Sequence, residues 1–467
     1  MNKVLVILLL LLGNIYVSGQ ESRVLTFDKY MDMVKQYHPV IYQANLLSDM
    51  ADGQERMARG GFDPKIEADW NHKSFDDKNY YSIASGLVKL PTWYGMELKA
   101  GYDRNSGDFL NDDEFIPTRG LWNAGISVPL GRGLVIDERR AELKRAKVYR
   151  EANAQEQVLM INDLLFNAAD AYLEWQVAQS YLDIATEGEE LASTRLTGMI
   201  SSFNNGDKPA IDTLESFISL QTRQLDLQKA QQVAENARLG LNNFLWIEGE
   251  VPLELAPKTI PEELDLTLLD TETSRLSLTQ DQFLAAHPEL LLYDYKVDNL
   301  QLDIRLAKED LKPDLRVNYN PLIGVAEDAL FDQFSANNYK LGASLTYPII
   351  QRKERGKLQL TRLKMQDTEY NQTMKRQELK VKLDTYINNI IQTNTQYTLL
   401  NQTVENYSRM LVAENRKLSI GESSIFLVNS REVKYLDSKY KQVEAGRKLI
   451  YNRLTYLLYL VQLEEVI

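Results

Sequence analysis

The stretch QELKVKLDTYINNIIQTNTQYTLLNQTVENYSRML, residues 377–411, contains neither proline nor glycine and has large side chains at alternating intervals of four and three. These positions are Leu379, Leu383, Tyr386, Ile390, Thr393, Tyr397, Leu400, Val404, Tyr407 and Leu411. Such spacing is typical of helices that pack by knobs into holes. The segment free of proline and glycine extends over 357–420, which would be about 96 Å long as a helix. The heptads predict very long packed helices, and taken alone they leave a plain coiled coil open.

The pattern also occurs in the first half of the chain, and other landmarks recur in the same order. The earlier heptad positions are Val158, Ile161, Leu165, Ala168, Tyr172 and Trp175. The recurring landmarks are His38-Pro39 with His287-Pro288, Pro64 with Pro313, Pro129 with Pro348, and Gly206 with Gly421. An ordered recurrence of this kind indicates tandem repeats. Each half is predicted to consist of a helix, extended segments, a long helix, a glycine turn and a long helix, with repeats at 20–255 and 256–467.

Extended segments are expected after Pro64 and Pro313, because the residue before proline is disfavoured in a helix. Six segments alternate between apolar and polar residues or carry strand-forming side chains: 65–72, 80–89, 95–103, 121–129, 314–320 and 340–347. Alternation indicates a strand with one apolar and one wet face. Tryptophan and tyrosine cluster in or beside these segments. Aromatic side chains near strand ends fit the girdles of a membrane barrel, and a soluble tyrosine-rich sheet is the alternative.

Six strands are too few for one chain to close a wide membrane barrel by itself. Strands left open in lipid would expose unpaired backbone groups at prohibitive cost. If these strands lie in a membrane, several chains must therefore share one barrel.

The composition and the N-terminus exclude several classes of protein. The 467 residues carry a formal charge of −13, which argues against nucleic acid as a partner. With no cysteine and three histidines, little is left for metal or general-base chemistry, and no cofactor, metal ligand or catalytic residue is predicted. Lys3, the apolar run 4–12 and small residues before Gln20 predict a secretory signal peptide over 1–19. No run of 18 apolar residues follows, so no membrane-spanning helix is expected.

Taken together, these features resemble the TolC-like outer-membrane efflux proteins, also called outer membrane factors. The resemblance rests on the two His-Pro helix starts, the segment from Val128 to Gly133 that leads into Arg139-Arg140-Ala141, and the two turns at 203–206 and 418–421. It covers essentially the whole chain after the signal peptide. No single motif is specific to the family, but the ordered set is.

The resemblance implies a mainly α fold with membrane β structure. Each chain of a homotrimer would contribute strands to one shared transmembrane β-barrel, and the long helices would form a coiled-coil tunnel beneath it. The family usually has four strands per chain. Here the segment between Pro64 and Pro129 is 30 residues longer than that between Pro313 and Pro348. The extra residues can form either a further hairpin that turns at 91–95 or a long surface loop.

The resemblance also implies a passive exit duct and not an enzyme. Such a channel would lie in the outer membrane of a Gram-negative bacterium and extend into the periplasm. It would serve a tripartite efflux or type I secretion system, coupled to a periplasmic adapter (membrane fusion) protein and an inner-membrane transporter. The sequence contains no GxxxxGK[ST] phosphate loop, so the energy would have to come from that pump.

The resemblance assigns two groups of site residues. Adapter docking and closure at the periplasmic tip would involve Gly206, Asp207, Asp212, Gly421 and Glu422. Boundaries between helices and strands would fall at Pro64, Pro129, Pro313 and Pro348. The chain departs from the family where Leu427 and Ser430 replace tunnel-narrowing aspartates, and where Ser423 replaces a basic residue.

Two further features have simpler interpretations. His38 and His287 precede prolines at predicted helix starts, so a structural role is expected for both. Asp112, Asp113 and Glu114 lie in a polar segment, where a solvated loop is expected and a divalent-cation site is the alternative. For the whole chain, the rival functions are a non-channel periplasmic coiled-coil structural or adapter protein and a secreted enzyme. No G-x-S-x-G or H-E-x-x-H motif supports the enzyme.

Overall fold

The computed structural model describes residues 24–267, 269, 280–324 and 334–467. The predicted signal peptide lies outside the described residues. The chain divides into two compact units. The helical unit comprises the described parts of 1–43, 160–283 and 379–467, and the sheet unit comprises those of 44–159 and 284–378. Both units draw on both halves of the sequence, and the repeat boundary at 255/256 stays a prediction.

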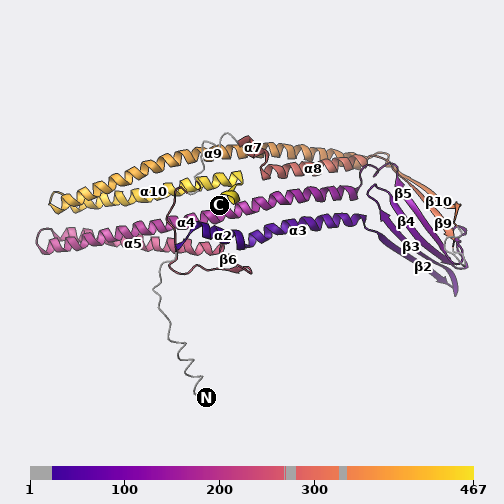
Figure 1. Cartoon of the computed structure of the whole chain (residues 1–467), viewed down its shortest axis with the longest axis horizontal. Coiled ribbons are helices and arrows are strands. Elements are labelled where there is room, and N and C mark those ends of the chain that lie inside the picture. The colour runs from indigo at the N-terminus through magenta and orange to yellow at the C-terminus, as the bar shows by residue number, and fades with distance from the viewer. Residues whose placement is uncertain (1–23, 268, 270–279, 325–333) are drawn as a thin grey trace, which may run out of the picture. The chain divides into compact units, whose positions relative to one another are not determined.

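A similar succession of helices, strands and long helices occurs twice along the chain, with four strands in the first set and two in the second (Figure 1). The first set consists of α2 (Phe27–Tyr37), α3 (Pro39–Arg59), β2 (Lys65–Phe75), β3 (Lys78–Pro91), β4 (Glu97–Ser106), β5 (Leu121–Pro129), α4 (Glu138–Asn204) and α5 (Ala210–Gly240). The second consists of α7 (Gln280–Ala285), α8 (Pro288–Glu309), β9 (Asp314–Gly324), β10 (Phe334–Thr346), α9 (Arg352–Ser419), α10 (Ile425–Leu460) and α11 (Leu463–Val466). Within the described ranges, no helix has a stretch both long and apolar enough to cross a membrane.

The sheet unit contains one antiparallel sheet of six strands in the order β10-β9-β5-β4-β3-β2 (Figure 1). All six predicted segments are strands, which confirms the expectation from alternation. The additional residues of the first half form a hairpin and not a loop. β2 and β3 pair from Lys65 with Lys89 to Phe75 with Lys78, and β3 turns into β4 where the Thr92 N–H donates to the Met96 carbonyl oxygen (2.8 Å).

The sheet has one apolar and one polar face across all six strands, because the register keeps like residues opposite each other. Residues that share the apolar face include Ile66, Ala68, Trp70, Ala84, Val88, Leu98, Ala100, Tyr102, Trp122, Ala124, Ile126, Val317, Tyr319, Leu341, Ala343 and Leu345. Residues on the opposite face include Lys65, Glu67, Asp69, Lys89, Lys99, Asp103, Asn123, Ser127, Arg316, Asn318, Asn320, Lys340 and Ser344. Ile83, Leu87, Leu121 and Leu322 interrupt the polar face, and His72 and Arg104 interrupt the apolar face. The sheet is therefore two-sided from one edge strand to the other.

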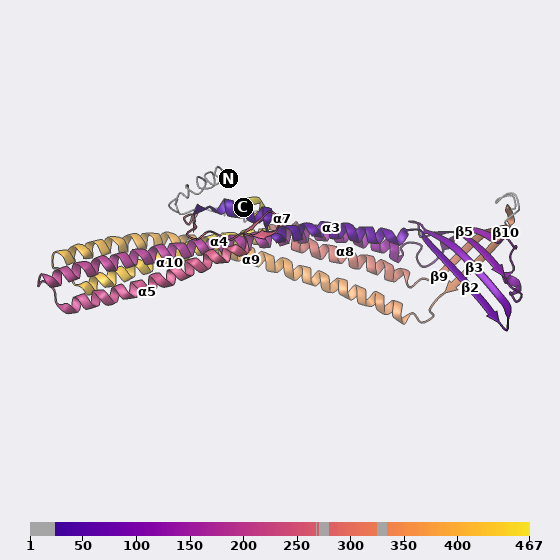
Figure 2. The same cartoon turned by 90° about the horizontal axis from the view of Figure 1, so that it is seen from below.

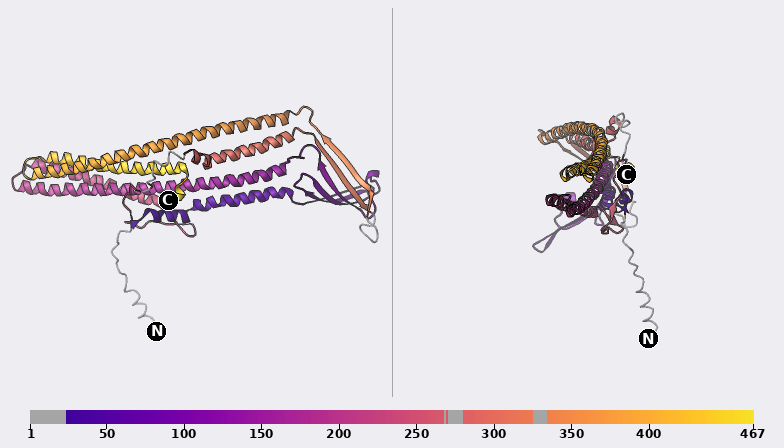
Figure 3. Two further views of the ribbon diagram at one scale, coloured as in Figure 1. Left: turned by 45° about the horizontal axis from the view of Figure 1, so that its top comes forward. Right: turned by 90° about the vertical axis from the view of Figure 1, so that its left-hand side faces the viewer.

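The helical segments of the sheet unit lie side by side in the order α3, α4, α8, α9 (Figure 3). Each neighbouring pair is joined by a polar contact: Asn153 Nδ2 to the Leu47 carbonyl oxygen (2.9 Å), Arg145 to Asp303 (2.5 Å), and Gln372 Nε2 to Asp294 Oδ1 (2.7 Å). Their order matches that of the strands β2 to β5, β9 and β10 to which they lead.

The helical unit has a well-packed core of leucines and aromatics. Tyr172 and Trp175 of α4 are at most 1% exposed, and their rings meet at 5.7 Å. The Tyr172 hydroxyl donates to the Leu25 carbonyl oxygen (2.6 Å). The hydroxyl of buried Tyr30 donates to the Ala168 carbonyl oxygen (3.2 Å). Burial raises the pKa of both tyrosines, which keeps these hydroxyls protonated as donors.

In the helical unit, the predicted heptad positions form the packed stripe of the long helices. Leu379, Leu383, Ile390 and Leu411 of α9 are buried, and the other positions are partly covered. α10 lies antiparallel to α9 and to α4 (Figure 2). Its contacts include Gln442 with Asn401 (2.7 Å), Asn452 with Thr393 (3.4 Å), Arg447 with Glu174 (3.3 Å) and Tyr435 with Glu187 (2.9 Å). The heptads therefore mark helix-to-helix packing, as predicted.

Candidate functional site

The turn between α4 and α5 is a glycine-capped helix end. The Asp207 N–H donates to the Ser202 carbonyl oxygen (2.9 Å), and the Gly206 N–H donates to that of Phe203 (2.9 Å). This pair of bonds is the Schellman motif, which requires a left-handed residue after the helix. Gly206 provides it with a φ of 79°. A β-carbon here would meet nothing within 4 Å, so backbone conformation alone favours glycine.

The turn between α9 and α10 has the same geometry. The Glu422 N–H donates to the Lys417 carbonyl oxygen (2.9 Å), and the Gly421 N–H donates to that of Leu418 (3.1 Å). Gly421 has a φ of 81°. Ser424 then caps α10 by accepting from the Leu427 N–H (3.4 Å). The two turns lie at the same end of the helical unit (Figure 2).

The predicted tip residues thus lie at the same end of the helical unit (Figure 2). Asp207 and Glu422 are exposed and follow the two glycines directly, whereas Asp212 is half-buried in the first turn of α5. A polar contact joins the hairpins, because Asn429 Nδ2 donates to Glu215 Oε1 (3.3 Å). Several apolar side chains near the two turns are also exposed: Phe203, Ile211, Leu214, Phe217, Ile420, Phe426 and Leu427.

Above the two turns lies a buried ion cluster that sequence reasoning missed. Glu432 of α10 is 1% exposed and forms ion pairs with Arg195 of α4 and with Arg223 of α5 (3.8 Å to the latter). Asp226 also pairs with Arg223 (3.2 Å). Burial, and then the charge of Arg223, lower the pKa of Arg195 to about 10, so Arg195 stays charged at neutral pH. The cluster joins the two hairpins through three helices.

A signal for this cluster was present in the sequence. Glu432 follows Ile425 and Val428 at helical spacing and precedes Leu436, and all of these residues are buried. An acidic residue within an apolar helical stripe indicates a buried ion pair, because an isolated buried charge is very costly.

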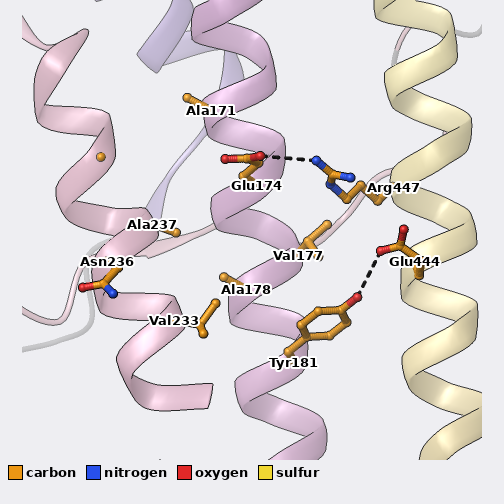
Figure 4. Close-up of a pocket in the computed structure, with 11 residues that line it drawn as sticks. Ala171, Glu174, Val177, Ala178, Tyr181, Val233, Asn236, Ala237, Glu444 and Arg447 are labelled. Atoms are coloured by element: carbon orange, nitrogen blue, oxygen red, sulfur yellow. Dashed lines mark hydrogen bonds and ion pairs between the residues drawn. The ribbon is translucent and has the colours of Figure 1, made fainter. Parts of the chain in front are cut away.

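A groove lies along α4, α5 and α10, farther from the turns (Figure 4). Its lining includes the small side chains of Ala171, Ala178 and Ala237. Two polar contacts tie α4 to α10 along its side: Glu174 with Arg447 (3.3 Å) and Tyr181 with Glu444 (3.2 Å). The structure therefore gives this groove a packing role between helices.

The strand boundaries on β5 and β9 are brought together. Pro129 is the last residue of β5, and Pro313 precedes β9. The Arg132 N–H donates to the Pro313 carbonyl oxygen (2.8 Å), and a β-carbon on Gly131 would lie 2.0 Å from that oxygen. The segment 128–133 that carries the family resemblance is thus a tight crossing of two chain segments, which explains its glycine.

The other two boundary prolines lie next to the two edge strands of the sheet. Pro64 directly precedes β2, and Pro348 lies between β10 and α9. Beside the crossing, Asp310 forms ion pairs with Arg132 (2.8 Å) and Lys357 (3.0 Å), which tie the start of α9 to this region.

The polar face of the sheet carries a close array of amides and carboxylates. Asn123 Nδ2 donates to Asp103 Oδ2 (3.0 Å) across two strands. On the same face, a β-carbon on Gly125 would lie 1.9 Å from Asn320 Oδ1. This face can hydrogen-bond with water. On the opposite face, Trp70, Tyr339 and Leu341 each have more than half of their surface exposed.

The histidines cap helices, which confirms the expected structural role. His38 Nδ1 accepts from the Val40 N–H, and His287 Nδ1 accepts from the Glu289 N–H, both at 3.2 Å. Asp112–Glu114 form one turn of 3-10 helix. The described residues contain no group of three or more histidine or acidic side chains placed to hold a metal ion.

Comparison of the chain with solved structures reveals its fold. The outer membrane channel CmeC of Campylobacter jejuni matches 93% of this chain and 85% of its own, with a TM-score of 0.63 and 12% identity. The open-state MtrE channel of Neisseria gonorrhoeae matches 93% of this chain and 88% of its own, with a TM-score of 0.65 and 15% identity. The outer membrane protein VceC of Vibrio cholerae matches 93% of this chain and 95% of its own, with a TM-score of 0.63 and 12% identity. Neither protein-family models nor curated sequences give a match.

The chain therefore has the fold of a TolC-like outer-membrane efflux channel, as the sequence resemblance predicted. Its structural relatives are channel proteins and not enzymes. Over the residues that the structure describes, the six-stranded sheet of the single chain is not closed on itself.

Proposed function

We propose that this protein is the outer-membrane exit duct of an export system, built as a homotrimer in a Gram-negative bacterium. The observation that carries the proposal is the two-sided sheet, whose apolar face continues over all six strands. A sheet in a soluble protein would cover this face with its own helices or with a second sheet. Lipid outside and water inside a shared barrel satisfy both faces at once.

Aromatic side chains support a position in the membrane. On the apolar face, Trp70, Tyr102 and Trp122 lie at similar heights along the strands, since Trp70 pairs with Ala84 and Tyr102 with Trp122. Trp93 lies nine residues farther along the chain than Ala84, in the turn after β3. The seven residues from Ala84 to Pro91 at the end of β3 span about 23 Å along the strand, or about 18 Å along the membrane normal at a tilt of 40°, and Trp93 lies beyond them. The spacing fits two interfacial girdles around an apolar band.

The helical tips would then face the periplasm and the rest of the export machine. Exposed apolar residues beside Gly206 and Gly421 offer a surface for a periplasmic adapter protein, with Asp207, Asp212 and Glu422 at its rim. The chain has no phosphate-binding loop, so an inner-membrane transporter would supply the energy. Efflux and type I secretion would use the same conduit.

The proposal is tested by membrane fractionation and by conductance of the purified protein in planar lipid bilayers. We expect the protein in the outer-membrane fraction, as a trimer in detergent by light scattering, with single-channel conductance. A periplasmic structural or adapter protein would instead appear in the soluble fraction and give no channels. That result would overturn the proposal.

A further inference from the structure

We infer that strand β2 of one copy pairs with strand β10 of the next, and that three copies close a barrel of eighteen strands. The inference rests on the proposed function and deepens it, because it names the seam between subunits and the width of the membrane segment. The resemblance to the TolC-like family implied four strands per chain, and this chain has six in one sheet.

Both edges of the sheet are open along their whole length in the described part of the chain. β2 pairs with β3 alone and β10 with β9 alone, and every residue of β2 is exposed. An open edge in hydrocarbon leaves backbone N–H and C=O groups without hydrogen-bond partners, which is strongly unfavourable. The missing partner must therefore provide an open strand of its own, and a second copy of this chain provides one.

The direction of the strands permits this pairing. All neighbours in the sheet are antiparallel, so the first and last of six strands run in opposite directions. β10 of one copy and β2 of the next are thus antiparallel, and the closed barrel is antiparallel throughout, as membrane barrels are.

The β2–β3 hairpin belongs to the barrel wall and is not an appendage beside it. Ten consecutive pairs, from Ser82 with Ser106 to Pro91 with Glu97, join β3 to β4. The hairpin also continues the two-sided pattern, because Trp70 and its partner Ala84 lie on the same face as Tyr102. A hairpin outside the wall would have no reason to keep an apolar face in register with the other four strands.

The apolar faces of the two edge strands also match at this seam. On the apolar face, Ile66 and Trp70 of β2 would continue the row formed by Leu341 and Leu345 of β10.

The strand number determines the width of the conduit in the membrane. Barrel diameter grows roughly linearly with strand number. With strands about 4.8 Å apart and tilted by about 40°, eighteen strands give a backbone diameter of about 36 Å, against about 24 Å for twelve. The additional hairpin would therefore make the outer-membrane mouth about 1.5-fold wider than that of a four-strand relative.

Cysteine cross-linking tests the seam, and the chain is suited to it because it contains no cysteine. Each double variant has one cysteine on β2, in place of Ile66, Ala68 or Trp70, and one on β10, in place of Leu341, Ala343 or Leu345. This gives nine double variants on the apolar face. We expect at least one variant to form covalent dimers and trimers on a denaturing gel after oxidation in membranes, and the single variants to give no covalent trimers. The Val317→Cys/Ala343→Cys variant, a directly paired position within the sheet, is the control for oxidation.

Two results would overturn the inference. The first is the absence of covalent trimers from all nine variants while the control disulfide forms. The second is cross-linking of the β10 cysteines to Leu98→Cys or Ala100→Cys of β4 in the next copy, which would place the hairpin outside the wall. In either case a trimer that still conducts would leave the proposed function intact, whereas a monomer without channels would refute both.

Discussion

Trp70 of the sheet unit and Trp175 of the helical unit differ in their surroundings. Trp70 is 72% exposed in the single chain, and Trp175 is 1% exposed. The helical unit buries its large side chains within one chain, around Tyr30, Tyr172 and Trp175. Among the described residues, both edges of the sheet are unpaired and large side chains of its apolar face are exposed. The comparison indicates that the helical unit is stabilised by its own core, whereas the sheet is completed only by lipid and by further copies.

The largest effect is expected from removing a core aromatic. Trp175→Ala should destabilise the helical unit by about 3–5 kcal/mol, because it opens a cavity among fully buried side chains. Trp70→Ala is the matched variant in the sheet and should leave the helical signal unchanged. Chemical denaturation followed by circular dichroism measures both. Equal destabilisation by the two variants would contradict the comparison.

The buried ions of the helical unit provide the second test. Glu432→Ala leaves Arg195 and Arg223 without their shared carboxylate, and breaking a buried pair in this way costs about 3–5 kcal/mol. Part of this cost is relieved if water enters, so we place it after the tryptophan. Glu422→Ala, at the exposed tip, is the control and should cost little. Thermal unfolding in detergent distinguishes them, and an unaffected Glu432→Ala would show that the cluster does not hold the hairpins together.

Substitutions at two neighbouring residues of β9 can distinguish the two faces of the sheet. Val317→Lys places a charge on the apolar face near the end of the strand and should cost up to about 1 kcal/mol per chain in a bilayer, because this cost falls toward the interface. Asn318→Lys places the same charge on the polar face, where water is available, and should insert normally. The amount of assembled trimer in outer membranes gives the measurement. Similar yields of the two variants would argue against a lipid-facing surface.

Effects of similar size but opposite sign are expected for two glycines with open space around the β-carbon position. Gly421→Ala should destabilise the turn by about 1 kcal/mol, because its φ of 81° is unfavourable for alanine. Gly356→Ala should stabilise the folded protein by up to about 1 kcal/mol, because Gly356 lies inside α9 and alanine has the higher helix propensity. Thermal unfolding midpoints provide the measurement, and shifts in the same direction would contradict the role assigned to the turn.

The smallest effect on stability, and one on function, is expected at Asp212. Asp212→Ala should leave trimer assembly intact, since the side chain is half-buried near the tip and not in the core. It should alter closure of the channel or coupling to the adapter. Planar bilayers test the first effect, and an unchanged closed-state conductance would argue against a gating role.

Much of the architecture could be predicted from sequence because it depends on local rules. Most of α9 falls in the segment 357–420 that is free of proline and glycine, the packed stripe follows from heptads such as Leu379 to Leu411, and the six strands follow from alternation. The choice between an additional hairpin and a loop could not be made, because it depends on whether β3 and β4 pair over ten residues. That pairing is set by contacts between distant segments and not by composition.

The candidate site was predicted less completely. The glycine turns could be found because a left-handed helix end requires glycine, and both show the same bonds. The cluster of Arg195, Arg223 and Glu432 was missed, since its members are widely separated in the sequence and ordinary surface charges have the same letters. The crossing of Gly131 and Pro313 likewise appears only when β5 and β9 are paired.

The most direct test is electron cryo-microscopy of the purified protein in lipid nanodiscs, viewed along the membrane normal. The account predicts three copies around one axis and a single closed wall of eighteen strands in the bilayer, with β2 against β10 at each seam. A monomeric particle, or one whose strands do not line a common lumen, would contradict the central claim that several chains together form one conduit.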